Sequence, residues 1–122
     1  MMNNCDDFVN LLIMTSDDMR TTYQEVVEYW RPESPPLTTL FAAFGDKMAE
    51  CFSSNRREFN SRVFLLIEQG MESGDDMLVT AVATGLIEAL AARAVQADGY
   101  WAEISLLLGP KSRSHAEAWL GT

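Results

Sequence analysis

Apolar residues recur every three to four positions along most of this chain, a spacing that places them on one face of an α-helix. β-Branched residues are few, and no segment alternates apolar and polar residues over four or more pairs, as a half-buried strand would. The pattern therefore predicts an all-α protein. The expected helices cover about residues 5–14, 17–31, 38–53, 56–72, 75–97 and 99–108, and a last short helix starts near Ser114.

Capping and helix-breaking residues support these boundaries. Thr15-Ser16-Asp17-Asp18 is typical of the cap and acidic first turn of a helix, and Pro32 ends the helix that follows. Asn55–Glu58 and Ser114–Glu117 match the capping box, so each is expected to open a helix. Gly109-Pro110 is expected to end the helix before it.

The segment 75–97 is apolar nearly all the way round, which predicts a helix in the middle of the domain. A chain of 122 residues is long enough to bury one core without a disulfide or a metal. The short loops favour antiparallel neighbours. We therefore expect residues 1–122 to form a single domain of six to seven helices, either an antiparallel helical bundle or a HEAT-like stack of helical hairpins. No internal repeat is visible, which weakens the case for the stack.

The charge balance is strongly one-sided, with 18 acidic residues against 9 lysines and arginines and a formal net charge of -9. Such a surface repels phosphate backbones and anionic lipid and attracts basic proteins. We therefore expect no nucleic-acid partner and no membrane partner. The first residues lack the basic region of a signal peptide, and no uninterrupted apolar run reaches the roughly 20 residues of a membrane span. Cys5 and Cys51 fit reduced thiols, so the expected location is cytoplasmic.

The sequence shows no set of catalytic or metal-binding residues. His115 is the only histidine, and its position in a short helix predicts a solvent-exposed side chain. A zinc site would need three or four soft or imidazole ligands. Glu68 and Glu88 lie inside apolar helices and could form an acid–base pair; the simpler expectation is that each bonds an arginine or reaches solvent. We therefore expect no enzymatic activity, no catalytic residue, no metal and no cofactor.

The second half of the chain resembles a known protein family. The resemblance rests on Ile67-Glu68-Gln69-Gly70, then Gly74-Asp75-Asp76, Val82-x-Thr84-Gly85-Leu86-Ile87-Glu88 and Leu107-Leu108-Gly109-Pro110, with Trp119 near the end. These segments resemble the small acidic helical immunity proteins of bacterial toxin–immunity systems, such as those of contact-dependent inhibition. The resemblance implies a cytoplasmic antidote that binds one cognate toxin domain stoichiometrically, and it carries over no catalytic residues.

Charge and resemblance lead to the same functional hypothesis. A nuclease toxin is basic because it must approach phosphates, and an acidic antidote can present carboxylates in their place. We expect an immunity protein of this kind, as a monomer or a weak homodimer. The alternative is a helical adaptor or self-associating structural protein without catalytic activity. The reading frames beside the gene would separate the two, because an antidote is encoded next to its toxin.

The expected toxin-binding surface is the outer face of helix 17–31 and the connector after it. Met19, Tyr23, Val26 and Trp30 form an apolar stripe that faces the core. The other side carries the predicted toxin-binding acids, which are Asp17, Asp18, Glu25, Glu28 and Glu33. Exposed aromatic residues often anchor interfaces, and the candidates are Tyr29, Tyr100 and Trp101. The competing interpretation is that this face is only solvated.

Overall fold

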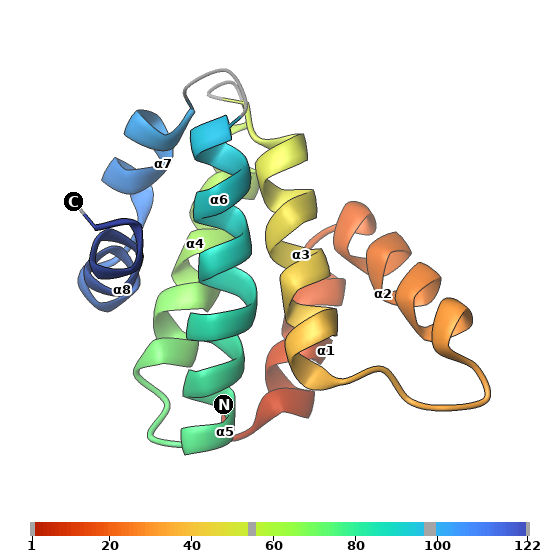
Figure 1. The fold of residues 1–122 in the computed structure, drawn as a ribbon. Helices are drawn as coiled ribbons and strands as arrows, with labels where there is room; N and C mark the ends of the chain where they lie inside the picture. The colour runs from red at the N-terminus through yellow and green to blue at the C-terminus, as the bar shows by residue number, and fades with distance from the viewer. Residues whose placement is uncertain (1, 54–55, 97–99, 122) are drawn as a thin grey trace.

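The computed structural model describes residues 2–53, 56–96 and 100–121, and the regular structure in those ranges is entirely helical (Figure 1). The all-α prediction is confirmed. The helices are α1 (Cys5–Thr15), α2 (Asp17–Trp30), α3 (Leu37–Cys51), α4 (Arg57–Met71), α5 (Asp76–Thr80), the π-helical η1 (Ala81–Ile87), α6 (Glu88–Gln96), α7 (Trp101–Leu107) and α8 (Pro110–Leu120). The segments α5, η1 and α6 follow one another without a break and form one long helix.

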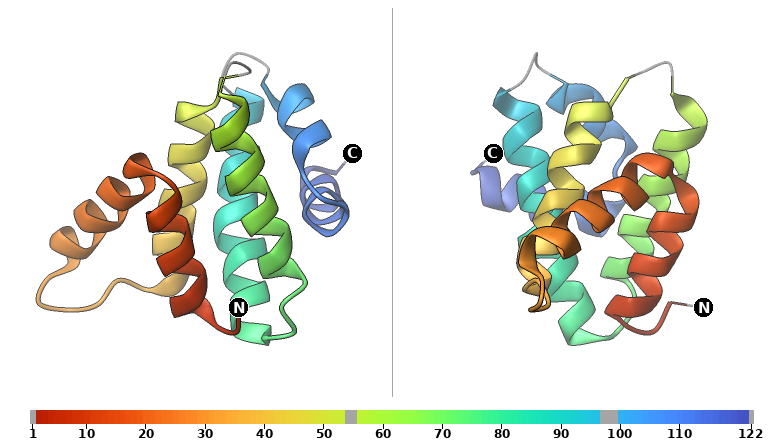
Figure 2. Two further views of the ribbon diagram at one scale, coloured as in Figure 1. Left: turned by 180° about the vertical axis from the view of Figure 1, so that it is seen from behind. Right: turned by 90° about the vertical axis from the view of Figure 1, so that its right-hand side faces the viewer.

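The long helix lies at the centre of the bundle, as the sequence predicts. It packs most extensively against α3, while α4 and α8 cover it from the other side (Figure 2). The side chains of Val82, Leu86 and Leu90 are fully buried. The rings of Phe8 and Phe41 stack on one another with centroids 5.3 Å apart, which ties α1 to α3. At one edge, α2 packs against α1 and α3 and leans away from the bundle (Figure 1).

The central packing depends on a very close approach between α3 and the long helix. A Cβ atom at Gly45 would overlap the carbonyl oxygen of Leu86, and it would lie 3.0 Å from the backbone nitrogen of Leu90. A Cβ atom at Gly85 would lie 2.8 Å from the Cβ of Phe41. The two helices therefore meet backbone to backbone, an arrangement that only glycine permits at Gly45.

Most predicted helix boundaries are confirmed to within two residues, and local capping explains one of them directly. A cap was expected within residues 15–18, and the structure assigns it to Ser16, whose hydroxyl accepts a hydrogen bond from the backbone N–H of Met19. The predicted capping box at Asn55–Glu58 involves Asn55, which lies outside the described residues.

The predicted start of the last helix is wrong. α8 begins at Pro110, and Ser114 and Glu117 lie inside it rather than at its N-terminus. Leu108 is extended and ends α7, Gly109 takes the N-cap position, and Pro110 occupies the first turn, where its missing N–H is not needed. The Gly-Pro pair thus lies between two helices and belongs to the start of the second one.

One helix among the described residues, Asp76–Gln96, is long and apolar enough to cross a membrane by length and composition alone. Polar residues interrupt it, so a search for uninterrupted apolar runs does not find it. The core helix of a globular domain passes the same test. Here the helix packs against α3, and its residues are largely buried inside the bundle.

Candidate functional site

The outer face of α2 is largely exposed and carries most of the predicted acids. Only Met19 and Thr22 of this helix are buried, while Tyr23 and Val26 are partly buried against the core. The predicted apolar stripe therefore does face the core, and its burial is complete only at Met19. The remainder of the helix projects polar side chains into solvent.

The predicted acids lie on this face or, for Glu33, in the connector after it. Asp17, Asp18 and Glu28 are each paired with an arginine. Asp17 contacts Arg20 at 3.0 Å, and Glu28 contacts Arg31 at 2.9 Å. These pairs are exposed, and such pairs add little stability. They reduce the negative field of the surface, so fewer carboxylates are free for a partner than the sequence suggests.

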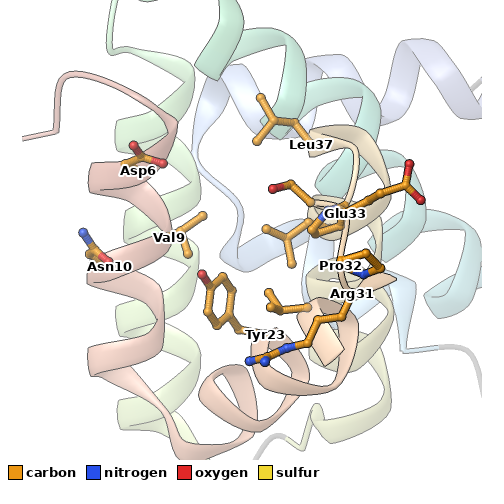
Figure 3. Close-up of a pocket in the computed structure, with 12 residues that line it drawn as sticks. Asp6, Val9, Asn10, Tyr23, Arg31, Pro32, Glu33 and Leu37 are labelled. Atoms are coloured by element: carbon orange, nitrogen blue, oxygen red, sulfur yellow. The ribbon is translucent and has the colours of Figure 1, made fainter. Parts of the chain in front are cut away.

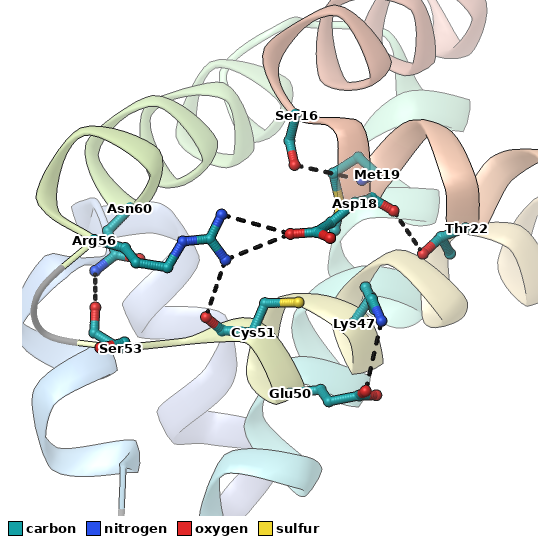
Figure 4. A network of polar contacts seen from close by, with 10 residues as sticks. All are labelled: Ser16, Asp18, Met19, Thr22, Lys47, Glu50, Cys51, Ser53, Arg56 and Asn60. Carbon is teal, nitrogen blue, oxygen red and sulfur yellow. Dashed lines mark hydrogen bonds and ion pairs between the residues drawn. The ribbon is translucent and has the colours of Figure 1, made fainter.

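Asp18 has a structural partner from a distant part of the chain. Its Oδ2 atom lies 3.4 Å from Nη1 of Arg56, which also donates to the carbonyl oxygen of Cys51 (Figure 4). This contact links the start of α2 to the segment between α3 and α4. Asp18 is therefore partly committed to the fold. Glu25 and Glu33 form no ion pair with any residue that the structure describes.

A cleft of about 700 Å³ opens beside this surface, between α1, the second half of α2 and the connector to α3 (Figure 3). Its apolar lining comes from α1, α2, the connector and the start of α3, which the fold brings together. The lining residues are Asp6, Val9, Asn10, Tyr23, Val27, Arg31, Pro32, Glu33, Ser34, Pro35, Leu37 and Leu40.

Five polar side chains of the cleft form no hydrogen bond or ion pair with the described part of the chain. They are the carboxylates of Asp6 and Glu33, the amide of Asn10 and the hydroxyls of Tyr23 and Ser34. A cleft that combines an apolar lining with free carboxylates suits a lysine or arginine side chain, because the stem of such a side chain is apolar and its end is cationic. The arrangement can bind a basic partner, and none of its side chains is an activated nucleophile.

The predicted aromatic anchors are divided between two sides of the molecule. Tyr29 is 83% exposed and lies on α2 with the acids. Tyr100 and Trp101 lie at the start of α7, which packs against α4 and α6 on the far side of the bundle from α2 (Figure 1). Tyr100 is partly buried and meets the ring of Phe52 edge to face at 5.3 Å. The structure therefore does not join these two residues to the acidic surface, and their role in binding stays a prediction.

The expected environment of His115 is wrong. Its side chain is only 30% exposed, and Nε2 lies 3.0 Å from Oε2 of Glu88. The partner is 27 residues away in the sequence, so helical periodicity could not reveal it. Glu88 consequently bonds the histidine rather than an arginine. The contact links the start of α6 to α8.

Glu68 is buried, and its hydrogen-bond partners are not arginines. Its carboxylate accepts hydrogen bonds from the backbone N–H groups of Lys111 and Ser112, both at 3.0 Å, and from the Ser112 hydroxyl at 2.7 Å. Burial alone would raise the pKa of Glu68, but these hydrogen bonds and the Lys111 charge outweigh it and lower the pKa. A Cβ atom at Gly109 would overlap this carboxylate. Glu68 thus accepts the free N–H groups at the start of α8 and caps that helix.

The two cysteines are free thiols in the structure, Cys5 buried and Cys51 partly buried. Burial, with nearby acids, raises the pKa of both, which keeps them protonated and weakly nucleophilic. In the described ranges, no three side chains of His, Cys, Asp or Glu lie close enough together to hold a metal ion.

Comparison with known proteins gives one relationship. No curated protein and no solved structure matches the chain. The model of one family, a domain of unknown function designated DUF7674, matches residues 9–121. That match includes all of α2, the central helix and α8, which supply most of the features described above. The chain therefore belongs to the DUF7674 family.

Proposed function

We propose that this protein is a cytoplasmic immunity protein that binds and neutralises a basic toxin domain, most simply a nuclease. The cleft between α1 and the α2–α3 connector carries the proposal, because its free carboxylates lie beside the acidic face of α2. The net charge of -9 and the resemblance to bacterial immunity proteins support the same function.

The mechanism is competition for cationic side chains. A nuclease binds phosphates with lysines and arginines, and carboxylates on the antidote can occupy the same groups. A specific interface buries about 1,600 Å² in total, which exceeds what one helix supplies. The proposed interface therefore combines the outer face of α2 with the rim of the cleft, where Asp6 and Glu33 are free.

The direct test starts from the reading frames beside this gene. The proposal expects one of them to encode the C-terminal domain of a large secreted protein, and that domain is then co-expressed with this protein. The protein should restore growth of cells that express that domain and should bind it in a one-to-one complex. Failure to restore growth and to bind would contradict the proposal. Failure together with a stable homodimer in light scattering would instead support the alternative, a self-associating adaptor.

Reversing the charge of Glu25 and Glu33 together, with Glu25→Lys and Glu33→Lys, should slow association with the toxin about tenfold at low ionic strength. Both carboxylates are exposed and free of ion pairs with described residues, so the melting temperature should change by no more than about 2 °C. Stopped-flow association rates at several salt concentrations provide the measurement.

A matched control places the same two charge changes elsewhere. Glu72 is the exposed residue directly after α4, and Glu103 is exposed on α7, both away from α2. Glu72→Lys with Glu103→Lys should slow association much less, because steering acts most strongly near the interface. Equal slowing by both pairs would show that net charge, rather than the α2 surface, controls binding. Asp18 is left unchanged because its contact with Arg56 would confound stability with binding.

A further inference from the structure

Two smaller clefts adjoin the cleft beside α2 and continue it along one end of the bundle. The first, of about 270 Å³, is lined by Asn4, Cys5, Asp6, Leu37, Asp75 and Met77. The second, of about 310 Å³, is lined by Leu37, Thr38, Asp76, Met77, Thr80 and Ala81. Leu37 lines all three clefts, and Met77 lines both of the smaller ones. Together they form a groove, which we call the acidic groove, from the α2–α3 connector past the starts of α1 and α3 to the start of α5 (Figure 1).

The acidic groove carries four carboxylates, which belong to Asp6, Glu33, Asp75 and Asp76. None of these side chains forms an ion pair or a hydrogen bond with a residue that the structure describes. Among the described lining residues only Arg31 is cationic, and it pairs with Glu28. The groove therefore holds an excess of negative charge that the described part of the chain does not neutralise.

Asp75 illustrates that these acids are not committed to the fold. It occupies the N-cap position of α5, where a carboxylate usually accepts an N–H group of the first turn, but its side chain forms no such hydrogen bond. Burial raises the pKa of the nearby Cys5 thiol, and the charges of Asp75 and Asp6 raise it further. Two acids from distant parts of the chain thus lie near one thiol, and α5 gains no capping bond from Asp75.

Helix polarity explains only part of this charge. The acids lie near the N-termini of α1, α3 and α5, which attract negative charge. Each N-terminus carries roughly half a positive charge, so three of them offset fewer than two of the four carboxylates. The remaining charge favours a cationic ligand.

The lining between the carboxylates is partly apolar. Met77 is 65% exposed, and Leu37 is partly buried against the core. An exposed methionine gains free energy when an apolar group covers it, and its flexible side chain adapts to the shape of a partner. A metal ion does not fit, because no three acids of the described residues lie close enough together to hold one. Carboxylates spread along a partly apolar groove instead suit lysine or arginine side chains spread along a chain.

We propose that the acidic groove binds an extended segment of a partner protein that carries several lysines or arginines and an apolar residue. The cationic side chains pair with the four carboxylates, and the apolar residue covers Met77. An extended chain advances about 3.3 Å per residue, against about 1.5 Å for a helix, so a few residues place charges along the whole groove. The inference rests on the proposed function, since it names the part of the toxin that this surface receives and extends the interface to α5.

The test is titration of the full chain with a capped heptapeptide of alternating lysine and alanine whose central residue is leucine, followed by ¹H–¹⁵N NMR at low ionic strength. The peptide should bind with a dissociation constant below about 1 mM and shift the resonances of residues 4–6, 31–38 and 75–81. The same peptide with glutamate for lysine should not bind, and the one with serine for leucine should bind about tenfold more weakly. Binding of the glutamate peptide, equal affinities for the leucine and serine peptides, shifts confined to the outer face of α2, or no binding below about 10 mM would each overturn the proposal.

Variants at the α5 end of the groove locate the peptide. Asp75→Asn with Asp76→Asn removes two charges, keeps the size of both side chains and should weaken binding about tenfold. Met77→Lys should weaken it at least as much without lowering the melting temperature, because Met77 is exposed. If the double variant does not fold, Met77→Lys still decides, and unchanged affinity in Met77→Lys would place the peptide elsewhere. As a control, Glu58→Gln with Glu103→Gln removes two charges from exposed residues outside the groove and should change affinity by no more than about twofold. Equal weakening by both pairs would show an effect of net charge alone and reject the groove.

Two further measurements identify the occupant and separate this inference from the proposed function. Spermine carries cationic groups on an aliphatic chain but has no apolar side chain, so it should bind more weakly than the heptapeptide. Equal or tighter binding of spermine would overturn the peptide in favour of a polyamine. With the toxin domain, Met77→Lys should weaken the complex about tenfold. A toxin complex that Met77→Lys leaves unchanged would overturn the acidic groove and leave the proposed function intact, whereas the expected peptide binding without any toxin complex would overturn the proposed function and leave the groove.

Discussion

Replacing Gly45 by alanine is expected to lower the free energy of unfolding by about 3 kcal/mol or more. The added Cβ atom would overlap the carbonyl oxygen of Leu86, and a backbone atom inside the central helix cannot rotate away as a side chain can. Alanine favours a helix over glycine by about 0.5–1 kcal/mol, which is too little to offset the separation of α3 from its main neighbour. Urea denaturation followed by circular dichroism measures the effect.

Two other variants make this prediction specific. Gly85→Ala should destabilise less than Gly45→Ala, because its Cβ would lie 2.8 Å from the Cβ of Phe41 and 3.1 Å from the carbonyl oxygen of Thr38. Thr39 is exposed on α3, so Thr39→Ala should change stability by no more than about 0.5 kcal/mol. If Gly45→Ala were as stable as Thr39→Ala, the backbones of α3 and the long helix would not be in close contact at Gly45, which would contradict the structure.

Replacing Glu68 by alanine is expected to lower the free energy of unfolding by about 2–3 kcal/mol at neutral pH. The change leaves the Lys111 N–H and both donors of Ser112 without their acceptor at the start of α8. Ser112 is fully buried, so water cannot replace the carboxylate without rearrangement. Chemical denaturation gives the loss of stability, and amide hydrogen exchange should show it concentrated in α8.

The same carboxylate predicts a dependence of stability on pH. The pKa of Glu68 is lowered in the folded protein, so its stabilisation is complete above the unfolded-state pKa of about 4.3 and is lost as the pH falls through the folded-state pKa. Glu68→Gln keeps the shape of the side chain but cannot titrate. Between pH 7 and pH 3 it should therefore lose less stability than the parent protein. Parallel curves for the two proteins would contradict the assignment of Glu68 as the charged cap.

The sequence by itself determined the class of fold and most of the core. Apolar residues at helical spacing must be buried together, and this requirement fixed the all-α class and the central position of the helix that contains Val82 and Leu86. A helix cap within residues 15–18 was also predictable, since donor and acceptor are only three residues apart. The acids of α2 could be assigned to one face for the same reason, because helical geometry relates residues within a few turns.

The start of α8 was decided only by the tertiary structure. A Gly-Pro pair can follow one helix or open the next, and the local sequence does not separate these cases. Here the carboxylate of Glu68, more than 40 residues earlier, accepts the free N–H groups after Pro110. That long-range partner makes Pro110 the first residue of α8 and leaves Ser114 inside the helix.

The candidate sites also depended on contacts that no local pattern contains. The cleft beside α2 exists because packing places Asp6 of α1 and Glu33 of the connector around one opening (Figure 3). The contact between Asp18 and Arg56 joins residues 38 positions apart, and it removes one predicted acid from the free surface. Tyr100 was assigned to that surface only by residue type, and the path of the chain placed it on the opposite side. Helical periodicity sets which face of a helix a residue occupies, whereas the packing of whole helices sets which faces meet.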